Sequence, residues 1–151
     1  MLHSLVVCSP RGVVRLSHFF VETTPEQRAA HELSLARGTA HLWAAARAVD
    51  IPVDVADGLS TVILSRHGLV FLASGVTAAG ASEESLAEDA ADLAELIKDV
   101  CDGNPSARLE DAGFVGKASV ALEQAACSGV LAFPGADNAL RLAKLKGPKT
   151  A

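Results

Sequence analysis

Few residues of this chain have the types and the spacing that catalysis or metal binding needs. The histidines are scattered singly, and no His-Glu-x-x-His or Gly-x-Ser-x-Gly motif is present. The cysteines lie at unrelated spacings without a Cys-x-x-Cys pair, which predicts free, buried thiols in a reducing compartment. We therefore expect no catalytic residue, no metal site and no cofactor. The residues concerned are His3, His18, His31, His41 and His67, and Cys8, Cys101 and Cys127.

Two further patterns have structural explanations. The segment 113–117 (GFVGK) resembles a phosphate loop, but its glycine spacing is short and no Ser or Thr directly follows the lysine. The acidic pairs Glu83-Glu84 and Glu88-Asp89 lie at the start of a predicted helix, where the helix dipole favours negative charge. Neither pattern indicates phosphoryl transfer or acid–base catalysis.

Arg15 is the one charged residue inside an otherwise apolar predicted strand. It can be an exposed strand residue or the partner of a nearby acid. It can also be a fixed positive charge that recognises an acidic or phosphorylated peptide. The sequence leaves both interpretations open.

Length and charge limit the class of protein. The 151 residues correspond to one domain, which we place at residues 1–146, with a flexible tail at 147–151. The net charge of −5 argues against a general nucleic-acid binder, which needs a basic face. The sequence carries no secretory signal, lipidation motif or membrane-spanning apolar run, so we expect it to reach a membrane only through partners.

The chain opens on a predicted hairpin. Residues 2–8 are apolar and rich in β-branched side chains, and 13–20 resume the strand pattern. Between them, Ser9-Pro10-Arg11-Gly12 supplies the residues of a tight turn. Both faces of the second strand carry apolar side chains, which indicates a sheet covered on both sides.

A helix is predicted directly after this hairpin. Thr24 and Gln27 have the spacing of a capping box, and Pro25 suits the first helical position. Gly38 falls inside the pattern, and we expect one helix that continues through it. The buried stripe predicted from the spacing is Ala29, Leu33, Ala36, Ala40 and Trp43.

Three more strands and further helices are predicted after it. The strands fall at 51–55, 59–65 and 69–76, with a hairpin at Arg66-His67-Gly68. The second helix is capped by Ser82 or Ser85, buries a stripe and ends at 103–105. That stripe is Leu86, Ala90, Leu93, Ile97 and Val100.

A third helix is predicted at 109–128, stopped by Gly129. An extended segment at 130–133 and a short helix capped by Asp137 follow. The whole pattern predicts an α+β fold in the order ββαβββαα plus a C-terminal helix. Its five-stranded sheet is mainly antiparallel and carries helices on both faces.

This order resembles the longin-type (SNARE-like) fold and, more narrowly, the small sigma-type subunits of heterotetrameric vesicle adaptor complexes. In the hairpin, Arg11-Gly12, Arg15-Leu16 and Phe19-Phe20 resemble the sigma pattern of a basic-Gly turn, Arg-Leu and paired aromatics. The other segments similar to sigma chains are 61–72 (TVILSRHGLVFL), Val100-Cys101 and 117–131 (KASVALEQAACSGVL).

The resemblance implies a non-catalytic subunit that binds the trunk of a large adaptin-type subunit in intracellular protein transport or endocytosis. Such a chain is cytoplasmic and lies peripherally on coated membranes. The small subunit of a TSET (TPLATE-type) complex fits as well as a clathrin-adaptor sigma chain. Some sigma chains also bind acidic dileucine sorting signals. By position, that site falls on Arg15, His67, Leu69, Ala90, Asp99 and Val100.

Two alternatives remain open at this stage. One is a longin-type subunit of a tethering (TRAPP-like) or GTPase-regulating trafficking complex. The other is a small enzyme, supported only by the polarity of Arg15 and His67. The chains that bind this protein would discriminate between the first alternative and an adaptor subunit.

Overall fold

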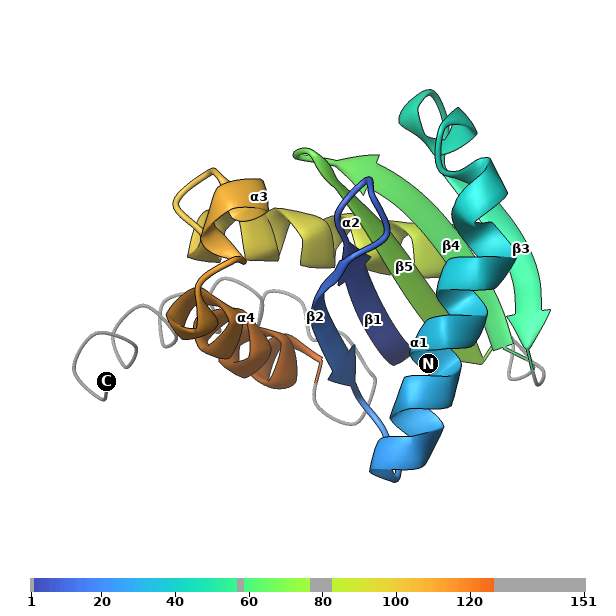
Figure 1. Cartoon of the computed structure of the whole chain (residues 1–151), viewed down its shortest axis with the longest axis horizontal. Helices are drawn as coiled ribbons and strands as arrows, with labels where there is room; N and C mark the ends of the chain where they lie inside the picture. The colour runs from blue at the N-terminus through green and yellow to red at the C-terminus, as the bar shows by residue number, and fades with distance from the viewer. Residues whose placement is uncertain (1, 57–58, 77–82, 127–151) are drawn as a thin grey trace.

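The computed structural model describes residues 2–56, 59–76 and 83–126. They form an α+β fold around one five-stranded antiparallel sheet, which confirms the predicted class (Figure 1). The strands are β1 (Leu2–Cys8), β2 (Val14–Phe19), β3 (Ile51–Ala56), β4 (Leu59–Arg66) and β5 (Leu69–Val76). The helices are α1 (Pro25–Thr39), α2 (Glu83–Val100), α3 (Pro105–Arg108) and α4 (Ala112–Ala125), with 3-10 turns at Ala40–Leu42 and Ala45–Arg47.

The strand order in the sheet is β2-β1-β5-β4-β3, so the first strand of the chain lies inside the sheet. Both predicted tight turns lie at one end of the sheet, which we call the hairpin end. Gly12 and Gly68 adopt φ values of +95° and +78° there, a region that favours glycine. At the other end, called the distal end, β1 begins, β2 finishes and β4 begins, and Ser4 pairs with Phe19.

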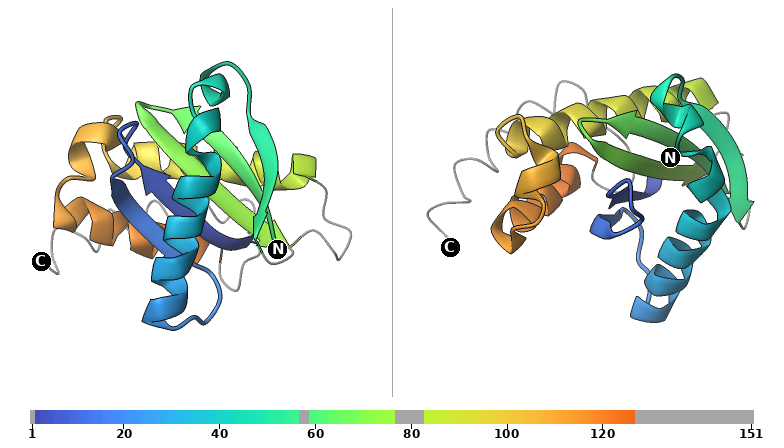
Figure 2. Two further views of the ribbon diagram at one scale, coloured as in Figure 1. Left: turned by 45° about the vertical axis from the view of Figure 1, so that its right-hand side comes forward. Right: turned by 45° about the horizontal axis from the view of Figure 1, so that its top comes forward.

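Two hydrophobic cores lie on opposite faces of the sheet, because alternate residues of the inner strands point to opposite sides. Val6, Ile63 and Leu72 face α1, whereas Leu5, Leu64 and Phe71 face α2 and α4. The views in Figure 2 show α1 on one side of the sheet and α2 on the other. Helix α1 therefore covers one face of the sheet, and α2 and α4 cover the other.

The predicted start of α1 is confirmed, but its predicted buried stripe is wrong. Thr24 and Gln27 form the capping box, and the helix passes through Gly38 before it ends at Thr39. The buried helix residues are Leu35 and Thr39, whereas Leu33 is 50% exposed. Of the predicted stripe (Ala29, Leu33, Ala36, Ala40 and Trp43), only Trp43 is buried, and it lies beyond the end of the helix.

The reason for this error is a buried hydrogen-bonded threonine. Thr39 Oγ1 donates a hydrogen bond to the carbonyl oxygen of Leu35 at 2.6 Å and accepts one from Trp43 Nε1 at 2.9 Å. Because the hydroxyl is satisfied, Thr39 can be fully buried at little cost. Thr39 thus occupies a core position on α1, although the spacing of apolar residues predicted that another face of the helix is buried.

Helix α2 agrees with its prediction, whereas the segment after it does not. All five residues of the predicted α2 stripe are buried: Leu86, Ala90, Leu93, Ile97 and Val100. The predicted third helix is divided, because Pro105 begins the one-turn helix α3 and Asp111 caps α4 through the Gly113 N–H at 2.8 Å. Ser85 lies inside α2 and is not its N-cap.

Several predictions lie outside the described residues. They concern the capping role of Ser82, the Cys127 thiol, the helix stop at Gly129 and everything predicted from residue 130 onward, including the flexible tail. Cys8 and Cys101 are free and buried, as expected. Burial raises the pKa of each thiol to about 11, so both are poor nucleophiles in the folded state.

Candidate functional site

Arg15, the charged strand residue, is paired with an acid. Its Nη2 atom lies 3.3 Å from Glu110 Oε1, in the link between α3 and α4. The Arg15 side chain keeps 28% of its surface exposed, and its buried Nε atom has no hydrogen-bond partner within the described residues. The interpretation of Arg15 as the partner of a nearby acid is therefore confirmed, and part of the guanidinium stays accessible.

His67 lies in the turn between β4 and β5 with a φ of +53°. Its Nε2 atom lies 2.8 Å from Glu95 Oε1 on α2, and Lys98 Nζ lies 3.6 Å from the other oxygen of the same carboxylate. The hydrogen bond from His67 lowers the pKa of the Glu95 carboxyl. The turn is thereby attached to α2, and the Glu95 charge is neutralised locally.

The three apolar residues of the predicted sorting-signal site lie in the core between the sheet and α2. Leu69 is 2% exposed, Ala90 0% and Val100 3%. Asp99 is exposed on α2, next to Val100. The structure places the apolar residues within one buried cluster, but they present no surface to a peptide in this conformation. Arg15, His67 and Asp99 remain at least partly accessible.

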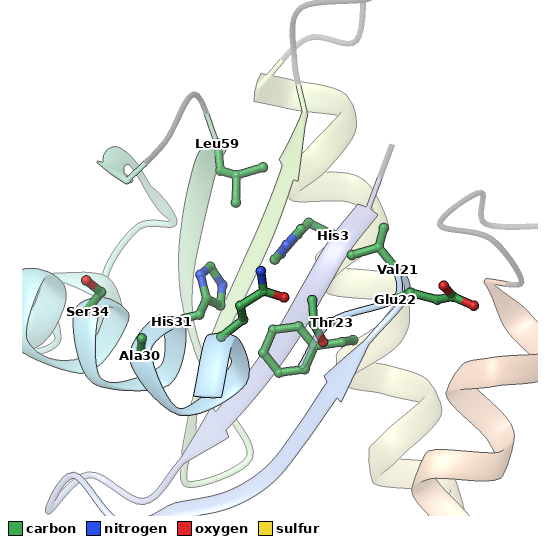
Figure 3. A pocket seen from close by; sticks show the side chains of 10 residues that line it. His3, Val21, Glu22, Thr23, Ala30, His31, Ser34 and Leu59 are labelled. Atoms are coloured by element: carbon green, nitrogen blue, oxygen red, sulfur yellow. The ribbon is translucent and has the colours of Figure 1, made fainter. Parts of the chain in front are cut away.

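A cavity lies at the distal end of the sheet, between α1 and the strands (Figure 3). Its volume is about 510 Å³. The start of β1, the end of β2, the segment after β2, the part of α1 from Gln27 to Ser34 and the start of β4 all contribute to its lining. Those that matter for its chemistry are His3, Phe19, Glu22, Gln27, His31 and Leu59.

A hydrogen-bonded cluster forms the wall of this cavity. The buried Ser4 Oγ lies 3.1 Å from His3 Nδ1 and 2.9 Å from His31 Nε2. The two imidazole rings are 4.8 Å apart edge to face, and the Phe19 ring lies 5.7 Å from His3 and 5.5 Å from His31. Burial lowers the pKa of His3, which favours a neutral imidazole at pH 7.

The cluster does not have the geometry of a serine nucleophile. Ser4 is 0% exposed, and its one hydroxyl group is shared between two imidazoles. A nucleophilic oxygen must reach its substrate, which this buried oxygen does not. Within the described ranges, no three His, Cys, Asp or Glu side chains come together as metal ligands.

No sequence pattern indicated this cavity. His3, Ser4 and His31 come from two elements, and Ser4 and His31 are 27 residues apart. An irregularity of register between Leu2 and Ser4 lets both His3 and Ser4 contact α1, against the normal alternation of a strand. Such a local irregularity has no reliable sequence pattern.

Comparisons with known proteins add no family assignment. Neither a scan against protein-family models nor a search of curated proteins finds a match to this chain. No helix in the described part of the chain is both long and apolar enough to cross a bilayer.

Proposed function

We propose that this chain is the small, sigma-type subunit of a vesicle-coat adaptor complex and acts as a non-catalytic scaffold for a large helical-solenoid subunit. The observation that carries the proposal is the arrangement around the N-terminal hairpin. The strand order is β2-β1-β5-β4-β3, with α1 on one face and α2 and α4 on the other. This arrangement supports the longin-type fold that the sequence resemblance implies.

The state of the polar residues at the hairpin end also favours a scaffold. Arg15 is paired with Glu110, which ties β2 to the link between α3 and α4, and His67 is paired with Glu95, which ties the β4–β5 turn to α2. Polar side chains that pair with a neighbouring element are typical of structural contacts, whereas a catalytic group needs an accessible reactive atom.

The hairpin also offers an apolar contact to a partner. Val13 is 52% exposed and Val14 36%, and both lie directly before Arg15 in sequence. Exposed apolar side chains next to a partly accessible charge are typical of the core and rim of a protein interface. We expect the large subunit to cover this part of β2.

Affinity purification of the tagged full-length chain from its own cells tests the proposal. Mass spectrometry should recover, in stoichiometric amounts, one large helical-repeat chain of the adaptin type together with the other coat subunits. Recovery of tethering-complex subunits instead would favour the TRAPP-like alternative. A monodisperse chain that recovers no large subunit would refute the adaptor proposal.

The contact is tested with matched valine substitutions. V13D with V14D should weaken binding to the recovered large subunit at least tenfold, because it places two charges in an apolar interface. V120D changes a valine of comparable exposure (42%) on α4, and it should leave the affinity within a factor of two. Equal losses in both variants would show that Val13 and Val14 are not the contact.

Dileucine recognition is a secondary part of the proposal. It rests on Arg15 and on the position of Leu69, Ala90 and Val100, which are buried in this structure. We expect an acidic dileucine peptide to bind the assembled complex, in which α2 can shift, and not the isolated chain. Fluorescence anisotropy with the labelled peptide measures both. Saturable binding to the isolated chain would contradict this expectation.

A further inference from the structure

We propose that the docking of α1 on the sheet depends on pH. In mildly acidic solution, protonation of the imidazole pair His3 and His31 releases the first half of the helix, residues 25–34, while its second half stays packed. The pair lies at the distal end of the sheet, opposite to the contact that the adaptor proposal assigns to Val13 and Val14. The two proposals are therefore independent.

The sheet presents different surfaces to the two halves of α1. At the distal end, three buried hydroxyl residues from β1, β5 and β4 lie side by side in register. They are Ser4, Ser74 and Thr61. Closer to the hairpin end, the same strands contribute three apolar residues to the core against α1. They are Val6, Leu72 and Ile63. The first half of α1 therefore lies against a polar row, and the second half lies against an apolar one.

The first half of α1 is correspondingly weakly packed. Residues 25–30 are all exposed, whereas the second half buries Leu35 in the core. The contacts of the first half with the strands involve His31 and Arg28, which both lie against the Phe19 ring. Figure 3 shows the His31 side chain directed from α1 toward the strands. The docking of this half therefore depends strongly on His31 and its partners.

The hydroxyl of Ser4 requires one neutral imidazole in this pair. Ser4 Oγ lies 3.1 Å from His3 Nδ1 and 2.9 Å from His31 Nε2, and Ser4 is fully buried. In the arrangement that satisfies the hydroxyl, its one hydrogen is donated to one of these nitrogens, and the oxygen accepts from the other. The nitrogen that accepts must be bare. A proton gained by that imidazole occupies this nitrogen and turns the hydroxyl hydrogen away, so a buried donor loses its acceptor.

The surroundings of the pair also oppose a positive charge. The two imidazole rings are 4.8 Å apart, and the Arg28 guanidinium lies 5.7 Å from the centroid of the Phe19 ring that contacts both. The acidic groups on the adjoining elements are Glu32, next to His31 on α1, and the exposed Glu22 after β2, whereas the row of hydroxyls on the sheet is uncharged.

The direction of the pH effect follows from burial. Burial lowers the pKa of His3 from its ordinary value of 6.5. The docked state therefore binds protons less readily than the released state. Docking is most favourable at a pH above the ordinary value, and it is lost as the pH falls through the pKa of the docked state.

Hydrogen exchange of the full chain, followed by NMR at pH 7.5 and pH 5.0, tests the proposal. A short helix without tertiary contacts is marginal in water, so release exposes its amides to exchange. The amides of residues 29–33 report on the first half. The second half is followed through the Ala40 amide, bonded to the Ala36 carbonyl oxygen, and the Trp43 indole N–H, bonded to Thr39.

The two halves should respond differently to acid. The loss of one buried hydrogen bond corresponds to about a tenfold change in an equilibrium constant, so protection factors of residues 29–33 should be about tenfold lower at pH 5.0. Protection of Ala40 and of the Trp43 indole should stay within about a factor of three. An equal loss in both halves would show general destabilisation and would overturn the proposal, as would unchanged protection of residues 29–33.

Matched variants connect the release to the two imidazoles. His3→Asn with His31→Gln replaces both rings by amides that do not titrate and that can still bond to Ser4, so protection of residues 29–33 should change by less than about twofold between the two pH values. H41Q removes an exposed imidazole beyond the end of α1 and should retain the loss of the wild type. A full loss in the double variant, or its absence in H41Q, would overturn the proposal. If the double variant does not fold, the comparison of the two halves in the wild type still decides.

Discussion

The hydroxyl of Thr39 should contribute measurably to stability, although it lies in a hydrophobic core. Thr39 is fully buried, and its oxygen accepts a hydrogen bond from the indole N–H of Trp43 at 2.9 Å. T39V preserves the side-chain volume but leaves that buried N–H without an acceptor. An orphaned buried donor costs about 1–3 kcal/mol, and no cavity term is added. We therefore expect T39V to lower the free energy of unfolding by about 1–3 kcal/mol.

Urea unfolding followed by circular dichroism measures this change, and a double-mutant cycle assigns its cause. In a W43F background the indole donor is absent, so T39V should cost less than about 0.5 kcal/mol. T39S keeps the hydroxyl and loses one methyl group, which costs about 0.8 kcal/mol. A loss below about 0.5 kcal/mol in the wild-type background would refute the reasoning, as would an equal loss with and without Trp43.

Three further predictions concern stability and use the same unfolding assay. L35A should lower the free energy of unfolding by about 2–5 kcal/mol, whereas L33A should change it by no more than about 0.5 kcal/mol, because Leu35 is buried and Leu33 is half exposed. A larger loss in L33A than in L35A would show that the buried face predicted from the sequence is the correct one. Burial lowers the pKa of His18, so the neutral imidazole stabilises the fold fully at a pH above the pKa of His18 in the unfolded chain, and this stabilisation is lost as the pH falls through the pKa in the folded state. H18Q should therefore lose less unfolding free energy between pH 7 and pH 5 than the wild type, and an equal loss in both proteins would contradict this. G68A should cost about 1–2 kcal/mol because a Cβ is strained at a φ of +78°, and a neutral effect would show that the turn relaxes.

The sheet and its turns could be predicted from sequence because their signals are local. The hairpins at Gly12 and Gly68 need a positive φ, and both glycines adopt it. The stripe of α2 was also predictable, because its buried positions are all apolar and recur at helical spacing. Where one local rule determined the outcome, the sequence was sufficient.

The α1 face and the helix α3 were missed where two rules compete. A threonine in a helix usually indicates a polar position, but the Thr39 hydroxyl is satisfied by Leu35 and Trp43. Pro105 after Gly103 indicates the end of a helix, but proline is equally suited to the first position of the next one. Contacts with residues elsewhere in the fold determine whether Thr39 is buried and whether Pro105 begins a helix, and a local sequence pattern does not contain these contacts.

The position of α1 connects the cavity with the proposed scaffold role. His31, Leu35 and Thr39 recur every four residues, so one row of α1 faces the sheet, and Ser4 fixes the row at its first member. That orientation closes the distal cavity and turns the row that contains Ala29 and Leu33 toward solvent. Exposing this face costs little free energy in the isolated chain, because it carries small side chains and one leucine. The same small side chains allow a helix of another subunit to approach closely. The irregularity at the start of β1, which brings both His3 and Ser4 to α1, therefore determines which face of this helix stays exposed for the partner proposed above.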